Sequence, residues 1–71
     1  MMYNIVLITT DGTSALYAER LTLDKVHEET QLLQKLMAKP LLILNVNGQM
    51  IVNTEIERMV VEVSKWLILV N

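Results

Sequence analysis

The sequence contains no cysteine, and it has a single histidine, His27, and a single proline. Without cysteine the chain can form neither disulfides nor thiolate zinc sites, and one histidine is too few for a histidine-rich metal centre. A chain of 71 residues can form one domain with a marginal core, which small proteins usually reinforce with a disulfide, a metal or a partner subunit. Self-association is therefore the expected means of reinforcement.

The sequence also lacks a large excess of either positive or negative charge, and it lacks long apolar runs. Six Lys and Arg against eight Asp and Glu give a net charge of −2, which argues against binding nucleic acid through its phosphates. The longest unbroken apolar run, residues 66–70, is far shorter than the roughly 18 residues of a membrane span. Residues 1–4 carry no basic side chain, so no secretory signal is expected. The sequence predicts a cytoplasmic protein with no nucleic-acid or membrane partner.

Asp11-Gly12 separates two segments that favour strands, residues 4–10 and 13–20. Asp-Gly between such segments predicts a β-hairpin with a two-residue type I′ turn, in which both central residues have positive φ. In that register Thr10 faces Thr13, Ile8 faces Ala15 and Val6 faces Tyr17.

Residues 23–38 have the pattern of an amphipathic helix. Thr22 is a suitable N-cap and Pro40 ends the helix. The apolar face is predicted to contain Val26, Thr30, Leu33 and Met37, widened by Leu23, Leu32 and Leu36.

A second hairpin is predicted from residues 41–46 and 49–53, which flank Asn47-Gly48. Its register places Val46 opposite Gln49, Leu44 opposite Ile51 and Ile43 opposite Val52. Beyond it, we expect a single helical turn at residues 54–57 followed by a strand. The alternative is a second helix, because short apolar runs discriminate poorly between helix and strand.

The expected fold is a single α+β domain over residues 1–71, with an antiparallel sheet of two hairpins plus a C-terminal strand and one amphipathic helix on one face. Residues 5–8 and 41–44 are apolar on both faces, which is typical of strands buried on both sides. One helix covers one face, so a second copy of the chain is expected to cover more, most simply in a twofold dimer. The predicted interface is the apolar C-terminal strand of Trp66, Leu67, Ile68, Leu69 and Val70.

Residues 5–13, an apolar strand followed by T-T-D-G-T, resemble the first motif of haloacid-dehalogenase-type phosphatases. The resemblance would make Asp11 the general acid/base and Thr9 the nucleophile. Threonine cannot form the aspartyl-phosphate of that family, and the chain is too short for its parallel sheet. The motif is therefore interpreted as a hairpin turn.

Two groups of titratable side chains are interpreted as solvated surface rather than as sites. Asp24 lies three residues before His27 and four before Glu28, which are also the spacings of a partial metal site on a helix. Arg58 lies among three carboxylates in the sequence, those of Glu55, Glu57 and Glu62. No catalytic, cofactor-binding or metal-binding residue is predicted, and the protein is not expected to be an enzyme.

Residues 41–63 are similar to a pattern found in small phage and prophage proteins, in which a hairpin and an Asn-Thr-x-x-Ile step lead into another strand. The resemblance implies a strand after Thr54 and a phage-type accessory or regulatory role.

The function that best fits these observations is a homo-oligomeric protein-interaction module. The alternative is a small-ligand binding module with a pocket between helix and sheet near Tyr17 and Trp66. A third reading is an enzyme subunit whose active site forms across an interface.

Overall fold

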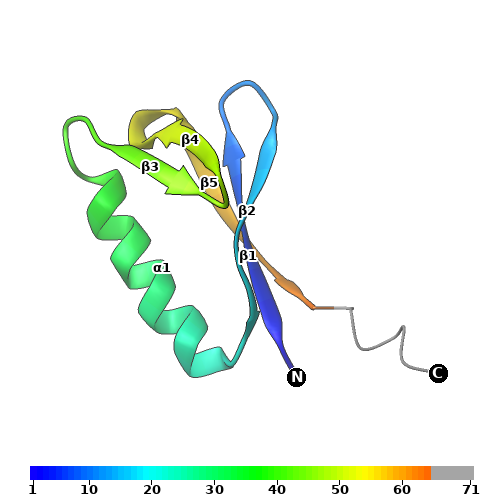
Figure 1. Ribbon diagram of the computed structural model, residues 1–71. Coiled ribbons are helices and arrows are strands. Elements are labelled where there is room, and N and C mark those ends of the chain that lie inside the picture. The colour runs from blue at the N-terminus through cyan, green and yellow to red at the C-terminus, as the bar shows by residue number, and fades with distance from the viewer. Residues whose placement is uncertain (65–71) are drawn as a thin grey trace.

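The computed structural model describes residues 1–64, which form one helix packed against antiparallel strands (Figure 1). The elements in chain order are β1 (Tyr3–Thr9), β2 (Ser14–Leu21), α1 (Leu23–Met37), β3 (Ile43–Val46), β4 (Gln49–Val52), a 3-10 turn η1 (Asn53–Glu55) and β5 (Ile56–Val63). The predicted α+β class is confirmed, and so is a short helical turn before a final strand.

The strands form two sheets. One has the order β2-β1-β5, and the other is the β3-β4 hairpin. Strand β5 therefore joins the first hairpin rather than the second. The helix contacts all three strands of the larger sheet and lies along one of its faces (Figure 1).

The core lies between this face, the helix and the smaller hairpin. Ile5 and Leu7 of β1 and Leu33 of the helix are completely buried. Along β1, the buried Ile5 and Leu7 alternate with side chains that point to the opposite face of the sheet, as expected for a strand. The buried cluster comprises Ile5, Leu7, Ala15, Leu33, Val46, Ile51 and Ile56.

The β1–β2 hairpin does not have the predicted turn. Gly12 N donates to Thr9 O at 3.0 Å, and Thr9 N donates to Thr13 O at 2.9 Å. Gly12 has a φ of +88°, whereas Asp11 does not have positive φ. This is a three-residue loop whose last residue is left-handed, in place of a type I′ turn. It pairs Leu7, not Ile8, with Ala15, so the predicted register is wrong by one residue.

The β3–β4 hairpin has the predicted turn and register. Asn47 and Gly48 have φ values of +54° and +86°, as a type I′ turn requires. Asparagine tolerates this conformation because its short side chain bonds locally. The predicted pairs Val46–Gln49, Leu44–Ile51 and Ile43–Val52 are confirmed.

Two irregularities interrupt β2. Its pairing with β1 shifts between Leu16 and Ala18, and again between Ala18 and Leu21. Arg20 lies at the second shift with a φ of +55°, and its N–H donates to Asn4 Oδ1 at 3.1 Å. Bulges of this kind increase the twist of a strand and weaken its edge for further pairing.

The helix begins and ends close to the predicted residues. Thr22 is the N-cap, since its hydroxyl accepts a hydrogen bond from Lys25 N at 3.4 Å. Val26 and Leu33 are buried, whereas Leu23 and Leu32 are 54% and 47% exposed. Including these two leucines in the packed face was therefore wrong, because the apolar stripe that reaches the sheet is narrower than the sequence indicates.

The side chain of Asn53 joins the helix to the second hairpin. Its Nδ2 donates to Leu36 O at 3.0 Å and to Lys39 O at 2.8 Å, and its Oδ1 accepts from Leu42 N at 2.9 Å. The backbone N–H of Asn53 also donates to Leu42 O at 2.8 Å. Only 1% of this residue is exposed, so its buried amide is satisfied by backbone groups at the helix C-terminus and at the start of the second hairpin.

We expect Leu33→Ala to lower the free energy of unfolding by about 2–5 kcal/mol, because the change leaves a cavity in the core. Leu32→Ala is the matched control, since the neighbouring leucine is half exposed. Chemical denaturation at one protein concentration measures both. Equal losses for the two variants would contradict the assigned helix face.

We expect Asn53→Asp to lower the free energy of unfolding by about 3 kcal/mol or more. The carboxylate would face the carbonyl oxygens of Leu36 and Lys39 with no N–H to donate. Asn45→Ala is the control, because Asn45 accepts only from Gly48 N in an exposed turn. An Asn53→Asp chain as stable as the control would show that this bonding is dispensable.

Candidate functional site

A polar hollow of about 310 Å³ lies where the β1–β2 loop meets β4 and η1. Thr10 N donates to Glu55 O at 2.9 Å and so ties the loop to η1. The residues that line the hollow are Thr9, Thr10, Asp11, Thr13, Gln49, Met50, Ile51 and Glu55.

The carboxylate of Asp11 is bonded within its own loop. Its Oδ1 accepts from the hydroxyl of Thr9, from Thr13 Oγ1 at 2.9 Å and from Thr13 N at 3.0 Å. These hydrogen bonds stabilise the ionised carboxylate and hold the pKa of Asp11 below its usual value. The bond from Thr9 has the largest effect, followed by those from Thr13. Asp11 is thus an ionised acceptor that fixes the turn, and β2 follows it where the phosphatase motif has a helix.

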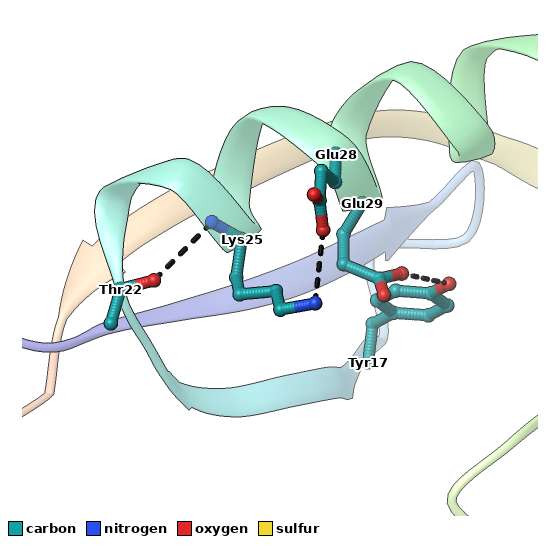
Figure 2. A network of polar contacts seen from close by, with 5 residues as sticks. All are labelled: Tyr17, Thr22, Lys25, Glu28 and Glu29. Carbon is teal, nitrogen blue, oxygen red and sulfur yellow. Dashed lines mark hydrogen bonds and ion pairs between the residues drawn. The ribbon is translucent and has the colours of Figure 1, made fainter.

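Tyr17 connects the sheet to the helix (Figure 2). Its hydroxyl donates to Glu29 Oε2 at 2.9 Å. Burial, the hydrogen bond to Glu29 and the charge of that carboxylate raise the pKa of Tyr17 to about 12. The hollow beside Tyr17, about 150 Å³, lies between β2 and the turn at Asn47 rather than between helix and sheet.

The acidic side chains near His27 do not converge on it. Glu28 pairs with Lys25 at 3.1 Å on the exposed side of the helix (Figure 2). His27 is also exposed, and its carbonyl accepts from Thr30 Oγ1 at 3.1 Å. Within residues 1–64, no three His, Asp or Glu side chains form a metal-binding group.

The charged residues around Arg58 are distributed over two elements. Glu55 belongs to η1, and Glu57, Arg58 and Glu62 belong to β5. Arg58 and Glu62 share one face of the strand, because alternate residues of a strand point the same way. Glu57 is the extra residue at the register shift between Ile56 and Arg58, where the regular alternation of the strand is interrupted.

The larger sheet has a face without a helix. Val6 and Ile8 of β1 lie on it, since their neighbours Ile5 and Leu7 point into the core. Leu16 and Val60 are the partners of Val6 on either side. All four aliphatic side chains are only half buried among residues 1–64. Residues 5–8 therefore have an apolar side on each face of β1. Residues 41–44 are not buried on both sides as expected, since Leu41 and Ile43 are 72% and 58% exposed.

The predicted interface of Trp66, Leu67, Ile68, Leu69 and Val70 lies outside the described residues, as does the Trp66 side of the predicted ligand pocket. No helix within residues 1–64 has the length and apolar character needed to cross a membrane. Neither a protein-family model, nor a curated protein, nor a solved structure matches this chain. The function has to be inferred from its own residues.

We expect the absorbance titration of Tyr17 to have its midpoint near pH 12 in a Tyr3→Phe background, where Tyr17 is the remaining tyrosine. Glu29→Gln should lower this pKa by removing the charge, while burial keeps it above 10. Because the folded chain binds this proton more tightly, its contribution to stability is present below pH 10 and lost between about pH 10 and 12.

Glu28→Gln is the matched control for this titration, since Glu28 pairs with Lys25 and not with Tyr17. Circular dichroism over the same pH range reports whether the chain is folded. A midpoint near pH 10 in folded protein would contradict the Tyr17–Glu29 contact.

Proposed function

We propose that the protein is a homo-oligomeric protein-interaction module without catalytic activity. The observation that carries this proposal is the helix-free face of the β2-β1-β5 sheet. Val6, Ile8, Leu16 and Val60 lie together there, and each keeps a minor part of its surface exposed. Contiguous aliphatic surface of this kind is typical of protein interaction sites.

Size and composition favour a second copy of the chain as one partner of the protein. Hydrophobic residues make up 52% of 71 residues, and no disulfide is available to reinforce the small core. Covering the exposed part of each aliphatic side chain would contribute about 0.5 kcal/mol. A few such side chains on both subunits supply a useful fraction of the stability of a small domain.

The polar hollow gives less support to a small-ligand module. Its carboxylate, Asp11, already accepts three hydrogen bonds from Thr9 and Thr13. A ligand there would compete with bonds that fix the hairpin turn. The cytoplasmic location and the phage-type accessory role remain part of the proposal on the strength of the sequence.

We expect the wild-type protein to sediment at micromolar concentration as a dimer or larger, above the 8.1 kDa of one chain. Val60→Lys should lower the mass to that of the monomer, because it places a charge among the aliphatic side chains of this face, on its edge strand β5. Met50→Lys is the control, since Met50 is 66% exposed on the separate β3–β4 hairpin. A folded wild-type monomer would contradict the proposal.

A further inference from the structure

The two edges of the larger sheet differ. At the β2 edge, two irregularities and the positive φ of Arg20 interrupt the strand. At the other edge, β5 pairs with β1 in an unbroken register from Arg58 to Val63. Among residues 1–64, no strand pairs with the outer edge of β5. A long, regular and unpaired edge is a template for a further strand.

The side chains of β5 do little to prevent such pairing. Natural edges are commonly protected by lysine, proline or a bulge. Residues 56–63 contain no lysine or proline, and the one irregularity in their pairing with β1 lies at the start of the strand, between Ile56 and Arg58. Farther along, Val61 and Val63 are 45% and 43% exposed. The side chains of Arg58 and Glu62 take part in no ion pair or hydrogen bond within residues 1–64.

A second copy of β5 complements this edge. When a strand pairs antiparallel with itself across a twofold axis, one residue lies opposite its own copy, and neighbours at equal distances on either side lie opposite each other. With Val60 at the axis, Arg58 lies opposite Glu62 of the partner subunit on the same face. Centring the pair on Met59 or Val61 instead would set Arg58 opposite Val60 or Ser64 of the partner subunit, and no opposite charges would meet.

We propose that β5 pairs antiparallel with β5 of a second copy about a twofold axis at Val60, which joins two three-stranded sheets into one of six strands. This inference rests on the proposed homo-oligomer and assigns its interface. Two Arg58–Glu62 pairs flank the axis on the helix-free face. On the opposite face, Met59 lies beside the partner's Val61. The interface is therefore aliphatic at its centre and charge-paired on both sides.

Charge reversal tests the register. In Arg58→Glu, residue 58 faces the partner's Glu62 at two symmetric positions, and in Glu62→Arg the two positions are both basic. Like charges directly opposite destabilise a strand pair, so we expect the dimer Kd of each variant to rise about ten-fold. An equimolar mixture of the two variants sets acidic opposite basic residues at both positions, and should form a heterodimer at about the wild-type Kd.

A cysteine at the axis gives an independent readout, because the chain has no cysteine of its own. In the paired strands, residue 60 and its copy have Cβ atoms about 5 Å apart, close enough for a disulfide after a small adjustment. We expect Val60→Cys to form a covalent dimer on mild oxidation. Ser14→Cys, exposed on β2 at the opposite edge, should remain largely uncrosslinked.

The outcomes separate the two proposals. Rescue in the mixture together with crosslinking through Val60→Cys would establish the β5 interface. A wild-type dimer with neither rescue nor crosslinking would overturn this interface and leave the homo-oligomer in place. A wild-type monomer that is folded by circular dichroism would overturn both.

Discussion

The amide of Asn53 is the interaction on which the arrangement of the two halves depends. It meets the end of α1 through two carbonyls and the start of β3 through Leu42, and Asn53 itself begins η1. A carboxamide has both the donors and the acceptor that these positions require. It sets where the second hairpin lies on the helix and where β5 leaves that hairpin to reach β1.

Local signals in the sequence predict the helix, the strands and the fold class. The type of the first turn and the packing of the second hairpin depend on contacts that those signals do not reveal. The helix and the Asn47-Gly48 turn follow from caps, periodicity and positive φ. The first hairpin differs because Asp11 bonds to Thr9 and Thr13, which favours a turn in which Gly12 alone has positive φ. The role of Asn53 depends on Leu36 and Lys39, seventeen and fourteen residues away at the end of α1 and just beyond it, which no local pattern reveals.

For the helix-free face, too, the sequence predicts the apolar residues of one strand but not their neighbours in the sheet. The apolar second face follows from the two-faced pattern of residues 5–8, and the structure adds Leu16 and Val60 as neighbours on either side. The charged cluster around Arg58 was visible in the sequence, but its meaning depends on β5. Regular alternation from Arg58 onward puts Arg58 and Glu62 on one face, and Glu57 lies at the register shift before them. The contact of Tyr17 with Glu29 requires helix and sheet to be placed first.

Symmetry links the β5 edge to the helix-free face. A twofold axis that pairs two identical antiparallel edges runs perpendicular to the sheet, so both helices lie on one side of the six strands. The two helix-free faces then lie side by side on the other side and form one wider aliphatic surface around Val6, Leu16 and Val60. Pairing through those faces alone would cover the aliphatic side chains but leave both β5 edges unpaired. Edge pairing instead satisfies the exposed backbone of β5, and it leaves the face available for contact with another protein.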